Sequence, residues 1–453
     1  MIAIAILLVH LLSTFQIINA AASEMHTNAV RDDGKALLAW KASLDNNSRL
    51  KLSSWSALEN SCTNWTGIQC NKAGRIKVIN ITSSGIKEEI GKLTSLQHLD
   101  LSENHLTNQI PRSIGNLDNL TGLHFFKNSL SGPIPEEIVN LISLEDLDLS
   151  TNNLTNQIPQ SIGNLSNLNI LFLYENSLSG PIPEEIGKLT FLEHLDLSEN
   201  HLTNQIPQSI GNLDNLTSFH FFKNFLSGPI PEEIVNIISL EDLDLSTNNL
   251  TNQIPQSIGN LSNLNILFLY KNSLFGPIPE EIGKLTSLEH LDLSENHLTN
   301  QIPRSIGNLD NLTSLHFFKN SLSGPIPEEI VNLISLEDLD LSTNNLTNQI
   351  PFSIGNLRKL SFLHLYQNNL TRHIPSSIGN LTNLRELILQ QNKLYGAIPR
   401  ELEKLKLMAD LRLFMNQLSG PLPMEFNNIT HLQKVRNFSK LSCWSFTTKY
   451  LQG

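Results

Sequence analysis

The sequence predicts a solenoid, in which short strands from successive 24-residue coils stack into one parallel sheet. Asparagine recurs at every twenty-fourth position, and the residues five and three places before it are Leu or Phe. Apolar residues at every second position are typical of a strand that buries one side. A strand this short needs adjacent coils to complete a core. The recurring residues are Asn104, Asn128, Asn152, Asn176, Asn200, Asn224, Asn248, Asn272, Asn296, Asn320, Asn344, Asn368, Asn392 and Asn416.

The N-terminal segment 1–22 is predicted to be a signal peptide. An apolar run from Ile2 to Leu12 precedes three consecutive alanines at 20–22, a small-residue pattern suited to cleavage. No Lys or Arg precedes the run, so an uncleaved membrane anchor is the alternative. After residue 22 no stretch reaches the 18 or so apolar residues that a spanning helix needs.

Segment 23–75 is expected to seal the first coil. Leu37, Leu38, Trp40 and Leu44 fall on one face of a predicted helix, which can cover an exposed sheet edge. Cys62 and Cys70 are close enough in sequence to close a small disulfide loop in an oxidising compartment. Two cysteines without a nearby His or Cys partner disfavour zinc. Cys443 has no evident partner.

Residues 76–430 comprise a short first turn and 14 full 24-residue turns. The recurring Asn is expected inside, where its amide satisfies backbone groups that a turn leaves unpaired. The second half of each coil carries apolar residues such as Ile182, Ile186 and Leu189 toward the core and forms the outer wall. Prolines there stand where no ladder hydrogen bond is needed.

One position of the coil alternates between glycine, as in Gly132, and asparagine, as in Asn156. A left-handed backbone suits both residues, although Arg372 occupies the same position. Leu96, Leu192 and Leu288 begin near-identical 96-residue blocks of four turns, which tandem duplication explains more simply than function does.

The pattern LxxLxLxxNxLxGxIPxxIGxL resembles the plant-specific class of leucine-rich repeats over residues 76 to about 430. The segment DDGKALLAWKASL, Trp55, and the stretch from Cys62 to Cys70 resemble the paired-cysteine N-terminal cap of plant receptor-like kinases, with the closest likeness to the male-discoverer-interacting receptor kinase group. The resemblance implies an α/β leucine-rich-repeat solenoid, a right-handed superhelix with a parallel β-sheet on its concave face, and an N-terminal cap over 23–75.

The resemblance weakens in residues 431–453, a degenerate turn followed by an unmatched tail. The glycine-rich loop, the invariant lysine and the HRD-type loop of a kinase do not occur in the sequence. The chain is therefore expected to be a receptor ectodomain truncated before its membrane helix and kinase, or a genuinely short protein. Kinase activity is not implied.

Outward strand positions on the predicted concave face are the candidate ligand-binding residues. Rows of exposed aromatic side chains typically mark interaction surfaces, and aromatic strands recur every second coil, about 9.6 Å apart. That spacing suits an extended peptide crossing the strands. The alternative is that duplicated side chains merely stack on one another. The candidates are Phe126, Ile170, Phe172, Tyr174, Phe222, Ile266, Phe268, Tyr270, Phe318 and Tyr366, with Asp148 and Asp244 on the acidic strands between them.

The acidic strands, such as Asp146, Asp148 and Ser150, are expected to form a solvated polar column. Two carboxylates on one face suit glycosidase chemistry, but nothing nearby in the sequence would raise the pKa of one of them. Of the positive residues, only Arg412 faces outward, with Arg385 lateral, so no Arg-x-Arg clamp for a peptide carboxylate is expected.

Fifteen Asn-x-Ser/Thr sequons suit a secreted glycoprotein, although several follow from the repeated NLT phrase and Asn80 is expected to be poorly accessible. They are Asn46, Asn64, Asn80, Asn119, Asn153, Asn164, Asn215, Asn249, Asn260, Asn311, Asn345, Asn369, Asn380, Asn428 and Asn437.

A net charge of −12 and a pI near 5.6 disfavour nucleic acid as a partner. We expect a non-enzymatic protein without cofactor or metal, which binds a peptide or protein ligand, with a co-receptor ectodomain as a further candidate partner. It would act in the apoplast, or at the plasma membrane if it is anchored. The rival interaction is inhibition of microbial cell-wall hydrolases, as by polygalacturonase inhibitors; a wall enzyme is the third class.

Overall fold

The computed structural model describes residues 33–39, 41–42, 49–50, 52–80, 88–420 and 434–435. The chain divides into two compact units, Met1–Leu202 and Thr203–Gly453. The predicted signal peptide at 1–22 lies outside the described residues, as does the tail at 431–453 apart from Lys434–Val435. The same holds for Trp40, Leu44, Asn46, Asn428, Asn437 and Cys443.

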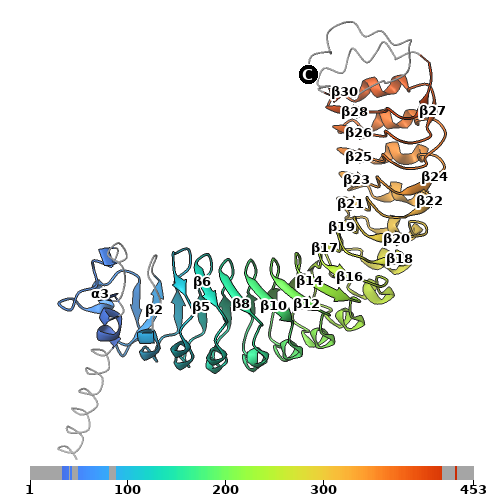
Figure 1. The fold of residues 1–453 in the computed structure, drawn as a ribbon. Helices are drawn as coiled ribbons and strands as arrows, with labels where there is room; N and C mark the ends of the chain where they lie inside the picture. Colours follow the sequence, from blue (N-terminus) through green and yellow to red (C-terminus); the bar gives the residue numbers. More distant parts are fainter. Residues whose placement is uncertain are drawn as a thin grey trace, which may run out of the picture. The chain divides into compact units, whose positions relative to one another are not determined.

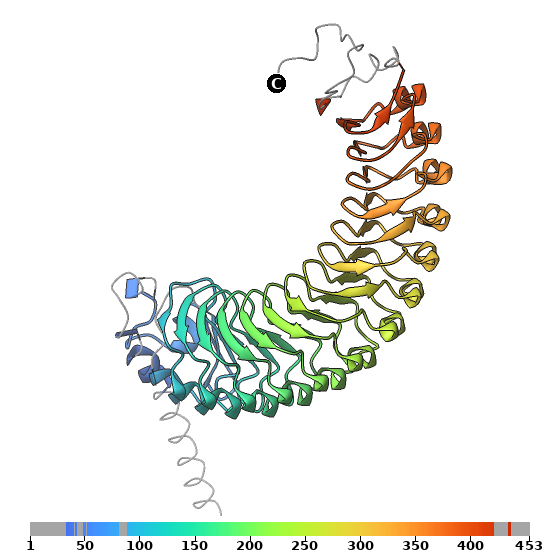
Figure 2. The ribbon, with the colours of Figure 1, turned by 45° about the vertical axis from the view of Figure 1, so that its right-hand side comes forward.

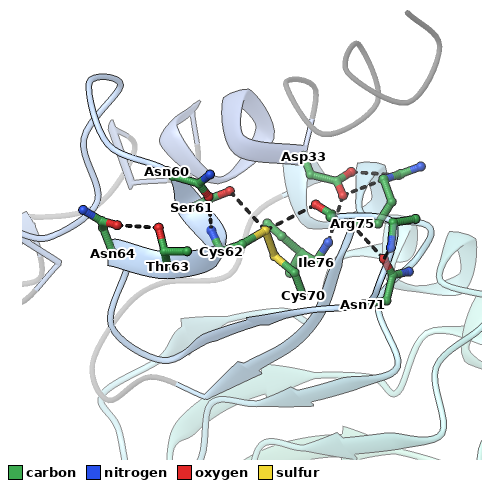
Figure 3. The surroundings of a disulfide bond; sticks show 12 residues. Asp33, Asn60, Ser61, Cys62, Thr63, Asn64, Cys70, Asn71, Arg75 and Ile76 are labelled. Atoms are coloured by element: carbon green, nitrogen blue, oxygen red, sulfur yellow. Dashed lines mark hydrogen bonds and ion pairs between the residues drawn. A yellow bond between two sulfur atoms is a disulfide. The ribbon is translucent and has the colours of Figure 1, made fainter. Parts of the chain in front are cut away.

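The cap of the first unit is held by a buried ion pair and a disulfide. Residues 33–39 are helical, with Leu37 buried and Leu38 half-buried. In this stretch, Asp33 accepts hydrogen bonds from Arg75 Nε and Nη2, at 2.7 and 2.8 Å, and from the backbone N–H of Ile76 (Figure 3). The predicted disulfide joins Cys62 in helix α3 (Ser61–Asn64) to Cys70 in strand β1 (Ile68–Cys70).

The coils of the first unit each contribute a first strand, and most add a second strand and a 3-10 helix. Strand β1 pairs antiparallel with β2, and from β2 onward the first strands pair in parallel. The 3-10 helices follow one edge of this unit (Figure 1). The first strands are β2 (Ile76–Asn80), β3 (His98–Asp100), β5 (Gly122–His124), β7 (Asp146–Asp148), β9 (Ile170–Phe172) and β11 (His194–Asp196); the second are β4 (Thr107–Asn108), β6 (Ser129–Gly132), β8 (Asn153–Asn156), β10 (Ser177–Pro181) and, ending across the unit boundary, β12 (His201–Asn204); the 3-10 helices are η1 (Glu88–Lys92), η2 (Arg112–Asn116), η3 (Glu136–Asn140), η4 (Gln160–Asn164) and η5 (Glu184–Lys188).

The second unit repeats this plan, with its first strands on one side of the coils and its 3-10 helices on the opposite side (Figure 2). Its first strands are β13 (Ser218–His220), β15 (Asp242–Asp244), β17 (Ile266–Phe268), β19 (His290–Asp292), β21 (Ser314–His316), β23 (Asp338–Asp340), β25 (Phe362–His364), β26 (Glu386–Ile388), β28 (Asp410–Arg412) and β30 (Lys434–Val435). The second strands are β14 (Phe225–Gly228), β16 (Asn249–Leu250), β18 (Phe275–Pro277), β20 (His297–Thr299), β22 (Ser323–Pro325), β24 (Asn345–Thr347), β27 (Tyr395–Gly396) and β29 (Gln417–Leu418). The helices are η6 (Gln208–Asn212), η7 (Glu232–Asn236), η8 (Gln256–Asn260), η9 (Glu280–Lys284), η10 (Arg304–Asn308), η11 (Glu328–Asn332), η12 (Phe352–Asn356), η13 (Ser376–Asn380) and η14 (Arg400–Lys404).

The predicted asparagine ladder is present within each unit, where it bonds most coils to the preceding one, as at Asn152 in the first unit and Asn272 in the second. Asn272 Oδ1 accepts a hydrogen bond from the backbone N–H of Leu250 at 3.0 Å. Its Nδ2 donates to the carbonyl of Leu245 in the preceding coil, at 3.0 Å, and to that of Leu269 in its own coil, at 3.2 Å. The amide thus satisfies backbone groups that the turn removes from both the strand ladder and solvent.

The helical side of the coils packs through glycines that no larger residue could replace without movement. A Cβ built on Gly259 in η8 would lie only 2.4 Å from the carbonyl oxygen of Glu281 in the next coil. Val235 stands at the corresponding position of η7, so this close approach is not needed in every coil.

The predicted left-handed position is also present, with φ of 67° at Asn252, 82° at Gly276 and 70° at Arg372. A second left-handed residue precedes each ladder asparagine in the described coils, as at Lys271 with φ 53°. Nothing in the sequence identifies this position, because Glu, Lys, Thr, Gln and Met all occupy it.

Candidate functional site

The outward side chains of the first strands form a surface that we call the sheet face, exemplified by Ile266, Phe268 and Tyr270 around β17. Leu267 and Leu269 between them are fully buried, so the period of two turns the alternate residues outward. The same arrangement holds around β9 of the first unit.

All the predicted ligand-binding residues lie half-buried on the sheet face. In the first unit they are Phe126, Asp148, Ile170, Phe172 and Tyr174, and in the second they are Phe222, Asp244, Ile266, Phe268, Tyr270, Phe318 and Tyr366. The parallel pairing places aromatic strands between acidic ones. The aromatic strand β17, for example, pairs with the acidic strands β15 and β19, so that Ile266 lies opposite Asp242 on one side and His290 on the other.

The aromatic rings contact one another and still leave area open. Phe172 and Tyr174 meet edge to face with ring centroids 6.1 Å apart, and Phe268 and Tyr270 do so at 6.2 Å. The stacking expected from duplication is therefore part of the arrangement. The rings nevertheless keep half-exposed surface in both units, which is what a ligand would cover.

The acidic strands differ from the solvated column that the sequence suggests. Ser150 and Ser246 are fully buried, not outward and solvated. The Ser150 hydroxyl donates to Asp148 at 2.6 Å, and the Ser246 backbone N–H donates to Asp244 at 2.9 Å. Burial raises the pKa of Asp148 and of Asp244, against the lowering effect of these hydrogen bonds. The expectation that nothing nearby would raise a carboxyl pKa is therefore wrong.

Histidines on the aromatic strands neutralise part of this acidity, a role that the sequence did not reveal. In the first unit, His124 Nε2 lies 2.9 Å from Asp146 Oδ2, and in the second unit His220 Nε2 lies 3.0 Å from Asp242 Oδ2. His316 stands between two carboxylates, 3.5 Å from Asp292 and 3.2 Å from Asp338. The sequence does show His and Asp alternating on adjoining strands, but whether they form ion pairs depends on their side-chain rotamers.

Stability should depend on pH through His316. Burial alone would lower its pKa, but hydrogen bonds to Asp292 and Asp338 outweigh burial and raise the pKa to about 10, above the unfolded value of 6.5. The stabilisation is therefore complete below pH 6.5 and is lost as pH rises from 6.5 to about 10. We expect His316→Gln to flatten the fall in Tm across this range, measured by calorimetry. His297→Gln, on the second strand β20, is the control; equal slopes for wild type and His316→Gln would contradict the assignment.

The outward-facing arginine of the last described coils is already paired. Arg412 Nη2 lies 2.6 Å from Asp410 Oδ2, and Arg412 Nε bonds the same carboxylate at 3.1 Å. Its guanidinium is therefore engaged by a carboxylate of its own strand. Phe414 was missed as a candidate, although it is half-buried at the position that Tyr366 and Phe318 occupy two and four coils earlier.

The described sequons lie mainly away from the sheet face. Those on second strands, or at the equivalent position, are Asn153, Asn249, Asn345 and Asn369. Those that end 3-10 helices are Asn164, Asn260 and Asn380, and those that precede first strands are Asn119, Asn215 and Asn311. Asn64 in the cap is exposed. Asn80 is exposed too, which corrects the expectation of poor access. It ends β2 opposite Asp100, on the sheet face of the first unit.

Neither a metal site nor a membrane helix is found in the described part of the chain. No group of three or more His, Cys, Asp or Glu is arranged there to hold a metal ion. Within the same ranges, every helix is too short or too polar to cross a membrane.

Comparison with known families gives two matches that together cover most of the chain. A model described as "Leucine-rich repeat region" matches residues 75–180, 161–273, 248–344 and 318–452. A second, described as "Leucine rich repeat N-terminal domain", matches residues 30–71.

Several of the similar proteins of known sequence or structure are plant receptors. The leucine-rich repeat receptor-like serine/threonine-protein kinase RGI4 of Arabidopsis thaliana is 38% identical over 109 residues, which is 23% of this chain and 10% of that protein. The plant peptide hormone receptor RGFR1 in complex with RGF2 is 40% identical with a TM-score of 0.79, covering 82% of this chain and 63% of that one. The Arabidopsis receptor kinase HAESA, with the peptide hormone IDA and the co-receptor SERK1, is 29% identical with a TM-score of 0.55, covering 89% and 85%. The chain thus spans only a small part of the curated relative.

Proposed function

This chain belongs to the leucine-rich repeat family, and from that premise we propose that it binds a peptide or protein ligand on its sheet face, in the manner of a receptor ectodomain. It would act outside the cell or at its surface, in signalling or defence, without catalysing a reaction itself. We also propose the division into a signal peptide (1–22), a cap (23–75), repeats (76–430) and a tail (431–453).

The observation that carries the proposal is the alternation of aromatic and acidic strands on the sheet face of each unit. Half-exposed Phe172 and Tyr174 in the first unit, and Phe268 and Tyr270 in the second, offer rigid apolar area in the centre of a broad surface. Such residues contribute strongly to interfaces because a partner removes them from water. The peptide complexes of RGFR1 and HAESA support a peptide as the ligand.

The placement of the sequons supports the same surface. Glycans at the ends of 3-10 helices and on second strands would leave the first strands of the second unit uncovered, since no sequon falls on the described outward positions there. A large ligand could therefore approach the second unit's sheet face without displacing sugar.

The test is peptide binding by the secreted, glycosylated protein. RGF2, IDA and a random 12-residue phage-displayed library serve as probes, and affinities are measured by calorimetry. We expect Tyr270→Ala to weaken the selected peptides at least tenfold, about 1.4 kcal/mol. Phe352→Ala is the matched control, because Phe352 is 66% exposed but starts helix η12 on the opposite side of the second unit.

Two outcomes would contradict the proposal. One is that no probe is bound. The other is that every bound peptide tolerates Tyr174→Ala and Tyr270→Ala. Capture of a microbial wall hydrolase that depends on these tyrosines would instead favour the inhibitor function.

A further inference from the structure

Strand β26 in the second unit departs from the pattern of the other acidic strands. At the equivalent positions of β15, β19 and β23 an aspartate is followed two residues later by a serine, which bonds to it: Ser294 donates to Asp292 at 2.5 Å. Around β26 the two positions hold Ile388 and Gln390. Duplication does not account for them, because no other described coil carries this pair.

Gln390 is buried although it points to the open side of the sheet. Its neighbours Leu387 and Leu389 face the core, so alternation turns Ile388 and Gln390 outward, yet these two are only 3% and 6% exposed. The side-chain oxygen of Gln390 has no hydrogen-bond partner in the described structure. A buried acceptor without a donor carries the cost of its lost hydration.

Aromatic residues flank Gln390 on both adjoining strands. The backbone N–H of Gln367 donates to the Gln390 carbonyl at 3.0 Å, and the N–H of Gln391 donates to the Phe414 carbonyl at 3.0 Å. Tyr366 and Phe414 therefore occupy the equivalent positions on either side, and both are half-buried. Gln390 therefore stands between two aromatic positions of the sheet face.

The charged groups around β25, β26 and β28 are already paired with one another. His364 Nε2 lies 3.1 Å from Glu386, and Arg412 is bound to Asp410. Burial alone would lower the pKa of His364, but Asp340 and Glu386 raise it. Three carboxylates thus face two cations here, and none of these groups donates a hydrogen bond to the side-chain oxygen of Gln390.

We propose that Gln390 is a specificity-determining residue, whose side-chain amide turns outward on binding so that its oxygen accepts a hydrogen bond from an N–H donor of a peptide ligand. The ligand crosses β25, β26 and β28 and lays an apolar side chain between Tyr366 and Phe414. The ligand supplies an N–H donor, because the unpaired atom of Gln390 is an acceptor. This inference rests on the proposed function and specifies the ligand chemistry of the same sheet face.

The inference predicts effects of opposite sign on the free and bound protein. Gln390→Met keeps the length of the side chain and removes the unpaired acceptor, so the Tm of the free protein should stay equal or rise. The same change removes the acceptor that the ligand needs, so peptide affinity should fall at least tenfold. Gln390→Glu retains an acceptor and should keep measurable binding.

The experiment uses the secreted full chain and the random 12-residue peptide library. Peptides selected on wild type are first sorted by whether Tyr366→Ala abolishes their binding, and those that depend on Tyr366 are titrated against Gln390→Met. Gln391→Met is the matched control: it is the adjacent residue, it is exposed, and Met415 shows that the same left-handed position accepts methionine.

Each outcome decides the inference. Tenfold weaker binding by Gln390→Met, unchanged binding by Gln391→Met and an undiminished Tm support it. Unchanged binding of Tyr366-dependent peptides by Gln390→Met, a lowered Tm, or recovery of peptides that depend on Tyr270 but never on Tyr366, overturns it while the proposed function stands. Recovery of no peptide that depends on any sheet-face tyrosine overturns the proposed function as well.

Discussion

Replacing Asn272 by alanine should lower the stability of the second unit by about 3–5 kcal/mol, because several buried backbone groups would lose their partner together. The substitution removes the acceptor for Leu250 N–H and the donor for the carbonyls of Leu245 and Leu269. Each orphaned group costs about 1–3 kcal/mol. Asn272→Asp should also destabilise, since it keeps the acceptor, loses both donated bonds and introduces a buried charge.

The measurement should resolve single coils, because repeat arrays do not always unfold as one cooperative unit. Urea unfolding gives the total loss, and hydrogen exchange locates it in the coils around β17. Gln256→Ala is the control, an exposed residue of the preceding coil that should change stability by less than about 0.5 kcal/mol. Equal stability of Asn272→Ala and wild type would show that the ladder is dispensable.

Replacing Gly259 by alanine should have a comparable effect on the helical side of the preceding coil. An added Cβ would lie 2.4 Å from a backbone oxygen of the next coil, so η8 and η9 would have to move apart. Overpacking of this kind costs about 3 kcal/mol, since neither backbone can turn aside as a side chain would. The change should appear as a lower urea midpoint with an unchanged m-value.

The coil that already carries a larger residue supplies the comparison. Val235→Ala at the equivalent position of η7 should change stability much less, because Val235 is only half-buried there. If Gly259→Ala and Val235→Ala were equally mild, tight stacking of η8 on η9 would not constrain the fold.

The sequence predicted the repeating core because its determinants recur at fixed spacing. Ladder asparagines, inward leucines such as Leu267 and the left-handed position at Gly276 all repeat by coil, and each was found as expected. Even Arg372 adopts the left-handed conformation, since the coil imposes φ there whatever the side chain.

The parts that the sequence did not predict depend on neighbours one coil away. Ser246 follows the outward period of its strand, but Phe222 and Tyr270 stand at the equivalent positions on the adjoining coils, and the serine is fully buried. The pairing of His316 with Asp338 likewise depends on rotamers across two strands. Gln390 likewise follows the outward period of its strand but is buried, between coils that hold Tyr366 and Phe414 at the equivalent positions, and its side-chain oxygen has no partner in the described structure.

The asparagine ladder also bears on how such a gene can change. Asn272 reaches only into the coil before its own, so any coil with the same amide can stand in either place. Unequal recombination that adds or deletes a whole 96-residue block would recreate every ladder bond at the junction. The number of 96-residue blocks can therefore change between alleles at little cost to folding. Residues outside the duplicated blocks, such as Gln390, would still occur only once in the chain.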